Sequence, residues 1–274
     1  MAASQSAKAE RFHLLHRGPG LFLIPNPWDA GSARMLASLG FQALATSSAA
    51  SAAVLGRRDG RIAREECLAH ARGIASATEL PVSGDLENGF GDAPEAVAET
   101  IRLAAEAGLV GGSIEDATGN PDRPLYDFVH AVERVAAAAE AARALPFLFT
   151  VTARTENYGR GNPNLDDTLK RLVAFEKAGA DVLFAPGLPD LAAVSAVCSA
   201  VAKPVNFMVG IRDKSFSAAS LAAAGVRRIS FAASLYRAAM TGLLEAAREA
   251  KDQGTFDYLK RVVTTPELNA LLGA

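Results

Sequence analysis

The chain has 274 residues, half of them hydrophobic and 21% charged, which is enough apolar material for one large buried core. Its formal net charge is −2 and its basic residues are scattered, which argues against nucleic-acid or anionic-membrane binding. No apolar run approaches the ~20 residues of a transmembrane helix, and residues 1–18 lack the apolar centre of a secretory signal.

The cysteines and histidines give no sign of a disulfide framework or a zinc site. Cys67 and Cys198 fall far apart in helix-like segments without CxxC spacing. No histidine pair has spacing such as HExxH, and His70 and His130 lie in alanine-rich helical patterns. We therefore expect a reduced, cytoplasmic protein.

Short apolar runs alternate with longer helical patterns along the chain. The runs are almost continuously apolar or small, which is typical of strands covered on both faces. The predicted strands are 21–25, 42–46, 81–85, 111–115, 147–153, 181–185, 204–208 and 228–231. Eight such alternations predict a (β/α)₈ TIM barrel. A doubly wound open sheet is the alternative, although no GxGxxG follows the first strand.

Helix boundaries carry recognisable signals. Asp92 followed by Glu95 resembles a capping box. Asn164 with Asp167 opens another helix, which Gly179 stops. After the last strand the chain keeps more helical sequence than one barrel repeat needs. We expect a single barrel domain over 1–274, with C-terminal helices over 235–274 that pack on another subunit.

Two carboxylates follow the third predicted strand. Asp85 and Glu87 are two residues apart, so on a strand they point to the same side and repel each other. A hard divalent cation such as Mg²⁺ would offset that repulsion, because it prefers carboxylate oxygen. The alternative is a pair of solvated turn carboxylates.

Polar residues follow the other strands too, and in a barrel these ends share the face that carries active sites. They are Trp28, Ser47, Ser48, Ala49, Asp59, Glu115, Asp116, Arg154, Glu156, Asn206 and Ser230. Each has a structural explanation by itself. Together they indicate a cation or a substrate network, because unpaired buried carboxylates are costly. An arginine among such acids suggests bidentate recognition of a carboxylate or phosphonate.

Five segments stand in a recognisable order and spacing. They are LGRRDG at 55–60, GDLENGFG at 84–91, SIED at 113–116, ARTEN at 153–157 and VNF at 205–207. Together they resemble the isocitrate lyase/phosphoenolpyruvate mutase superfamily, from about residue 22 to the end of the barrel. The resemblance implies a barrel enzyme that binds small 2-oxo acids and uses Mg²⁺, or Mn²⁺ in its place.

The resemblance also implies roles for individual residues. Asp85 matches the principal metal ligand, and Glu87 and Glu115 reach the metal partly through water. Asp59 matches a catalytic aspartate, and Arg154 matches the arginine at the anionic end of the substrate. The expected substrate-binding residues are Trp28, Ser47, Ser48, Ala49, Arg154, Asn206 and Ser230, with the small stretch 47–49 acting through backbone amides. The eighth helix is typically exchanged between subunits, in dimers paired into tetramers.

The loop after the fourth strand departs from the family pattern. Isocitrate and methylisocitrate lyases carry a Lys/Arg-Cys-Gly-His motif there, whereas this chain has ATGNPDRPLYD at 117–127. The phosphonomutase branch has a lysine where this chain has Ala117, and oxaloacetate-decarboxylating branches also lack the cysteine. We expect the loop to close over the substrate without contributing thiol chemistry. Tyr126, Tyr158 or a metal-bound water could supply the proton.

These observations predict a Mg²⁺-dependent carbon–carbon lyase. It would cleave or decarboxylate a small 2-oxo or 2-hydroxy acid by way of a metal-stabilised enolate. One alternative is P–C chemistry, as in phosphoenolpyruvate mutase or phosphonopyruvate hydrolase. A non-catalytic metabolite-binding barrel is another, disfavoured because the metal acids and Arg154 are all present.

Overall fold

Eight parallel strands form one sheet in the computed structural model, which describes residues 3–273. The strand order is β1-β8-β7-β6-β5-β4-β3-β2, and Ala45 N–H donates to Pro25 O at 3.0 Å where the two ends meet. The strands are β1 Phe22–Ile24, β2 Leu44–Ala45, β3 Val82–Asp85, β4 Gly111–Glu115, β5 Thr150–Arg154, β6 Val182–Phe184, β7 Val205–Met208 and β8 Arg228–Ser230. The predicted (β/α)₈ barrel is confirmed, and the open sheet is wrong.

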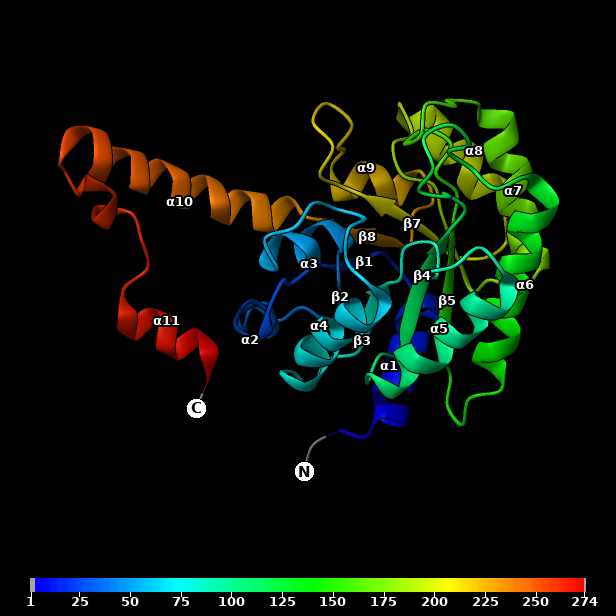
Figure 1. The fold of residues 1–274 in the computed structure, drawn as a ribbon, viewed down its shortest axis with the longest axis horizontal. Coiled ribbons are helices and arrows are strands. Elements are labelled where there is room, and N and C mark those ends of the chain that lie inside the picture. Colours follow the sequence, from blue (N-terminus) through cyan, green and yellow to red (C-terminus); the bar gives the residue numbers. More distant parts are fainter. Residues whose placement is uncertain (1–2, 274) are drawn as a thin grey trace.

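Helices cover the outside of the barrel, and a long C-terminal helix projects away from it (Figure 1). They are α1 Gln5–Arg17, α2 Ala30–Ser38, α3 Ser48–Val54, α4 Arg64–Ser76, α5 Pro94–Glu106, α6 Phe128–Arg143, α7 Leu165–Lys177, α8 Leu191–Ala200, α9 Ala218–Ala223, α10 Ser234–Gln253 and α11 Thr265–Leu272, with a 3₁₀ turn η1 at Asp257–Lys260. Over residues 3–273, none of these helices combines the length and apolarity that a membrane crossing requires.

One predicted helix start is confirmed and the other is wrong. Asn164 caps α7, since its Oδ1 accepts from Asp167 N–H at 3.0 Å. The Asp92–Glu95 capping box does not form, because α5 begins with Pro94 at its first turn and has no side-chain cap. Instead, Asp92 Oδ1 accepts the hydroxyl proton of Tyr126 at 2.6 Å. Asp92 therefore makes a tertiary hydrogen bond in place of the helix cap that the local sequence predicted.

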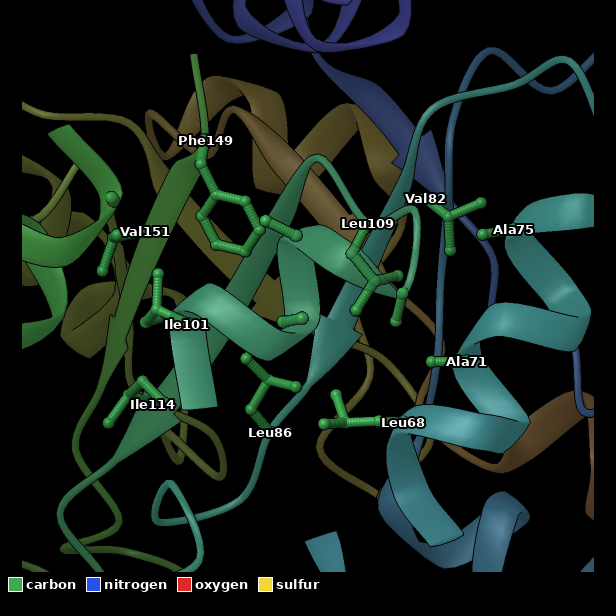
Figure 2. Packing of buried hydrophobic residues seen from close by; sticks show 14 of the residues in the cluster. Leu68, Ala71, Ala75, Val82, Leu86, Ile101, Leu109, Ile114, Phe149 and Val151 are labelled. Atoms are coloured by element: carbon green, nitrogen blue, oxygen red, sulfur yellow. The ribbon is translucent and has the colours of Figure 1, made fainter. Parts of the chain in front are cut away.

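Leu86 fixes the main chain that follows β3. Its side chain is fully buried among apolar residues of α4 and α5 (Figure 2). Two glycines make room for it, because a Cβ on Gly84 or Gly112 would lie 3.0 Å from Leu86 Cδ2 or 2.5 Å from Leu86 Cδ1. Successive strand side chains point to opposite faces, so this anchor turns Asp85 away from the helices.

Helix α1 packs across the amino-terminal end of the strands. Phe12 is fully buried there, in a cluster with Phe22 and Val110. One turn later, His16 donates from Nδ1 to Phe12 O at 2.8 Å. The neutral Nε2 then accepts from Arg228 Nη1 at 3.2 Å, inside the barrel. The sequence alone gave no sign that this helix closes the barrel.

We expect the stability of the protein to fall when the pH drops below about 6.5. Burial, followed by the charge of Arg228, lowers the pKa of His16 to about 3, and nearby His13 and Arg227 act in the same direction. Below about pH 6.5 the unfolded state therefore binds a proton at this imidazole that the folded state does not bind. This difference lowers the free energy of unfolding by about 2 kcal/mol between pH 7 and pH 5. Urea unfolding at both pH values should show a smaller loss in His16→Gln than in the wild type. Equal losses would contradict the assignment.

Candidate active site

A cavity of about 320 Å³ opens at the carboxyl ends of the strands. The side chains around it come from segments far apart in the sequence, as the barrel topology predicted. The predicted site residues that line it are Ser47, Ser48, Ala49, Asp59, Asp85, Arg154, Asn206 and Ser230. The structure therefore brings most of the predicted set to one place.

Arg154 is the centre of the charged groups in this cavity. Its Nη1 lies 3.7 Å from Asp85 Oδ1, its Nε lies 3.4 Å from Glu115 Oε2, and Nε also donates to Glu156. Its guanidinium stacks over the ring of Phe184, 5.1 Å from the ring centroid. Burial opposes the charge of Arg154, but the three carboxylates outweigh burial and raise its pKa. The arginine is thus held as a cation in a fixed orientation.

Glu115 is almost completely buried beside this arginine. Burial raises its pKa to about 8, and the charges of Glu156 and Asp85 add to that effect, whereas Arg154 and Arg160 oppose it. Arg160 reaches Glu115 Oε1 from the other side at 3.4 Å. At neutral pH this carboxylate is consequently close to its own titration point, which is typical of groups at functional sites.

Glu87 has a strained backbone conformation and a carboxylate that lacks one hydrogen-bond partner. Its backbone φ is 48°, in the left-handed region that few non-glycine residues adopt. Its Oε1 is buried and has no hydrogen-bond partner among the described residues. Burial raises its pKa to about 7, with further increases from the charges of Asp85 and Asp59. A buried oxygen of this kind indicates a missing positive partner.

Asp85, Glu87 and Glu115 have the chemistry of a site for a hard divalent cation. Within residues 3–273, no three Asp, Glu, His or Cys side chains stand close enough to form a ready-made metal site. Arg154 contacts both Asp85 and Glu115. The donors nevertheless fit Mg²⁺ or Mn²⁺, because all are carboxylates and one oxygen of Glu87 is buried without a partner. Their convergence on one ion stays a prediction.

Residues 46–48, which follow β2, are hydrogen-bonded to Asp85. Ser48 N–H donates to Asp85 Oδ2 at 3.0 Å, and Ser47 accepts from Ala50 N–H as the N-cap of α3. Thr46 Oγ1 accepts from the backbone N–H of Asp85 at 2.9 Å. These bonds tie the predicted anion-binding stretch to the first predicted metal ligand.

Four predicted site residues do not line the cavity itself: Glu87 and Glu115, which lie beside it, and Trp28 and Tyr126. Trp28 packs edge-on against Tyr236 of α10, with ring centroids 5.6 Å apart. The Tyr126 hydroxyl accepts a hydrogen bond from Asn88 Nδ2 at 3.1 Å and donates one to Asp92 Oδ1. Burial and that bond raise the pKa of Tyr126 to about 12. As a proton donor to substrate, Tyr126 would first have to break its bond to Asp92.

The loop 117–127 forms a short self-bonded hairpin. Ala117 and Leu125 make an antiparallel bridge, and Thr118 N–H donates to Pro124 O at 3.0 Å. Asp116, just before the loop, is hydrogen-bonded to the segment after β5, because its Oδ1 accepts from Glu156 N–H at 2.8 Å. Closure of the loop over a substrate remains a prediction.

Thiol alkylation of the folded protein should leave turnover unchanged. Cys67 is 2% exposed, and its pKa rises to about 12 through burial and then the charges of Asp85 and Glu87. Cys198 lies away from the cavity, and burial raises its pKa to about 11. Because thiolates are the reactive species, neither residue should react quickly at neutral pH. Loss of turnover in proportion to iodoacetamide labelling would show that a cysteine takes part.

Sequence analysis missed two arginines at the cavity. Arg228, the first residue of β8, and Arg237, the fourth residue of α10, both line it. A charged residue at the start of an otherwise apolar strand was the available signal for Arg228. Nothing in the sequence pointed to Arg237 as a cavity residue, because the C-terminal helices were expected to pack on another subunit.

Comparison with known proteins identifies close structural relatives. A family model described as phosphoenolpyruvate phosphomutase matches residues 12–251. A crystal structure of a provisionally assigned lyase/mutase from Burkholderia cenocepacia is 54% identical, with a TM-score of 0.96, and the match covers 98% of this chain and 97% of that one.

Curated relatives are more distant in sequence. An uncharacterized protein of Mycobacterium tuberculosis is 30% identical over 95% of both chains. The oxaloacetate decarboxylase of Bradyrhizobium diazoefficiens is 32% identical over 73% of this chain and 70% of its own length. Other matches include 2-methylisocitrate lyases and a 2,3-dimethylmalate lyase. These relatives share small organic acids as substrates where their names give one.

Proposed function

We propose, from the premise that this chain belongs to the isocitrate lyase/phosphoenolpyruvate mutase superfamily, that it is a divalent-cation-dependent carbon–carbon lyase. Its substrate would be a small 2-oxo or 2-hydroxy acid, which it cleaves or decarboxylates. One observation carries the proposal: the carboxylates of Asp85, Glu115 and Glu156 converge on Arg154, which lines a small cavity at the carboxyl ends of the strands.

The size of the cavity favours a small acid as the substrate. About 320 Å³ lies at the lower end of the range for ligand pockets. Arg154 would pair with the anionic end of this acid, because a guanidinium offers parallel donors to a carboxylate. The backbone amides of Ser47 and Ala49 would hold a second oxygen group, because that of Ser48 already donates to Asp85, and Asn206 and Ser230 would contact the acid from β7 and β8.

Asp85, Glu87 and Glu115 would hold Mg²⁺, or Mn²⁺ in its place. When bound, such an ion stabilises the negative charge that develops on the 2-oxo group during bond cleavage. The protein residues orient the acid and keep water out. We assign Asp59, which lines the cavity, to the reacting end of the acid. Asp59 and Glu115 are the carboxyl groups that we propose to give or take a proton there, because a positioned carboxyl group can act as a general acid or base.

P–C bond chemistry is the second candidate function. The family model carries the phosphomutase description, and a provisionally assigned phosphonomutase from Burkholderia cenocepacia is 37% identical to this chain. Against it, the position of the lysine in that branch is Ala117, which is buried and offers no nitrogen. We therefore rank C–C cleavage first.

A substrate screen tests the proposal and separates the alternatives. Purified protein with Mg²⁺ would be offered oxaloacetate, branched malates and phosphonopyruvate, with product formation followed by mass spectrometry. Turnover of a C–C substrate supports the lyase, and turnover of phosphonopyruvate alone supports the second candidate. Calorimetric binding without turnover of any compound would favour a metabolite-binding barrel. Arg154→Met should nearly abolish turnover of the confirmed substrate, and Arg102→Met is its matched control, because within residues 3–273 this exposed arginine pairs only with Glu99.

The protein is expected to form a homo-oligomer through its C-terminal helices. Helix α10 has no buried residue, and Leu243 and Leu244 are 58% and 51% exposed. The chain then returns, so that α11 contacts α2 and leaves α10 extended on its own (Figure 1). A long helix with exposed leucines needs a covering surface, and we propose that a second copy supplies it.

Light scattering after size exclusion should therefore give a multiple of the chain mass. The double change Leu243→Asp, Leu244→Asp should shift the mass toward the monomer, because two buried apolar contacts would become charged. Arg248→Ala on the same exposed helix is the matched control and should keep the wild-type mass. A monomeric wild type across a hundredfold range of concentration would refute this proposal.

A further inference from the structure

Arg228 is a buried cation at the wall of the cavity with only neutral partners. It is 5% exposed, and within the described residues no carboxylate pairs with it. Its Nε donates to Asn206 Oδ1 at 2.8 Å, Nη2 donates to Thr152 Oγ1 at 3.0 Å, and Nη1 contacts His16 Nε2 at 3.2 Å. A buried guanidinium without a counter-charge is costly, so simple stabilisation of the fold does not account for it.

The contact with Asn206 fixes which way that amide points. A guanidinium has only donors, so the atom facing Arg228 must be the amide oxygen. The nitrogen of Asn206 then lies on the other side, where it donates to Ser230 Oγ at 3.0 Å. Since Ser230 Oγ accepts this bond, its own proton is available to a ligand. Asn206 and Ser230 both line the cavity, so this wall presents donors.

His16 holds the guanidinium of Arg228 from the side away from the cavity. The Nδ1 proton of His16 is committed to Phe12 O, which leaves Nε2 as an acceptor for Arg228. Phe12 and His16 belong to α1, the helix that closes the amino-terminal end of the barrel. Arg228 therefore donates on both sides: to His16 away from the cavity, and to Asn206 toward it, and Asn206 in turn donates to Ser230 at the cavity.

We propose that Arg228 is a positioning residue that orients the Asn206 amide, so that Asn206 and Ser230 offer hydrogen-bond donors to a substrate oxygen. This inference rests on the proposed function, because it places an anionic oxo acid in the cavity. It also sets a specificity: the wall selects carboxylate or oxo oxygens, which only accept, and disfavours groups that must donate at that point.

The experiment compares four variants with oxalate as the probe, because it is a small dianion with only acceptor oxygens. Binding is measured by calorimetry in the presence of Mg²⁺. Arg228→Met should weaken oxalate binding on the order of tenfold, and Arg228→Lys, which keeps a donor, should restore most of it. Thr152→Val removes a different partner of Arg228, so it should lower stability but keep the affinity within about twofold.

Asn206→Asp gives the sharpest contrast with a merely structural role. The new carboxylate would pair with Arg228 and raise the melting temperature, while the lost N–H and the added negative charge would weaken oxalate binding by more than tenfold. Stability and affinity should thus move in opposite directions. This variant also serves if Arg228→Met does not fold.

A readout without substrate separates the two proposals. The side-chain amide resonances of Asn206 should shift in Arg228→Met and return toward the wild-type positions in Arg228→Lys. If wild-type protein does not bind oxalate, the assigned ligand class fails while the amide signals still decide the role of Arg228. Unchanged amide signals in Arg228→Met, or wild-type affinity in Asn206→Asp, would overturn the inference.

Discussion

Arg154→Met is expected to lower kcat/KM by roughly 10²–10⁴-fold on whichever substrate is confirmed. Truncating one partner of a buried, hydrogen-bonded charge pair with a ligand costs about 2–5 kcal/mol, and Arg154 is the proposed partner of the substrate's anionic end as well as of Asp85, Glu115 and Glu156. Arg154→Lys keeps the charge, but one nitrogen cannot meet several carboxylates and also pair with the substrate. A loss on the order of 10²-fold is therefore expected for the lysine variant as well.

Metal binding should respond to Arg154→Met in the opposite direction. The change removes a positive charge from contact with Asp85 and Glu115, so the affinity for Mg²⁺ should stay the same or rise. Calorimetry with Mg²⁺ beside steady-state kinetics would show this separation, with Arg102→Met as the control. Wild-type kinetics in Arg154→Lys would refute the bidentate role.

Asp85→Ala is expected to abolish both Mg²⁺ binding and activity while the barrel stays folded. Asp85 holds together the carboxyl-end face of the site, accepting from Ser48 N–H at 3.0 Å and from Ser113 Oγ at 3.4 Å. Its removal takes away the ligand from which the predicted metal set starts. The packing of Leu86 lies on the other face of the strand and should persist.

The measurement is calorimetric titration with Mg²⁺, with circular dichroism to establish folding. Asp166→Ala, an exposed acidic residue in the first turn of α7, is the matched control and should bind Mg²⁺ like the wild type. Unchanged Mg²⁺ affinity in folded Asp85→Ala would remove Asp85 from the metal site, and with it the proposed ligand set.

Sequence reasoning succeeded where the signal was repeated along the chain. Each strand is a short apolar run, and a barrel requires eight of them, so an error in one boundary does not change the fold. The strand predicted at 147–153 runs instead at Thr150–Arg154 because Arg154 pairs in register with Glu115 of β4. The residues at the strand ends then follow from topology alone.

Sequence reasoning failed where one side chain had a choice of partners. Asp92 reads as a helix cap but bonds Tyr126, and this bond in turn holds the proton that made Tyr126 a candidate acid. Trp28 packs on Tyr236, a contact that sequence reasoning did not foresee, and its substrate role stays a prediction. In each case the alternative partner lies far away in the sequence.

The sequence by itself determined the barrel and which residues follow its strands, because hydrophobic periodicity and strand order are properties of the chain; the site that these residues form stays a prediction. Only the tertiary structure decided how the charges pair. Arg154 among three carboxylates and Arg228 among neutral groups look alike in sequence, as single arginines in or next to apolar strands. Their different roles follow from burial, which makes each nearby charge or hydrogen-bond acceptor count far more than it would in water.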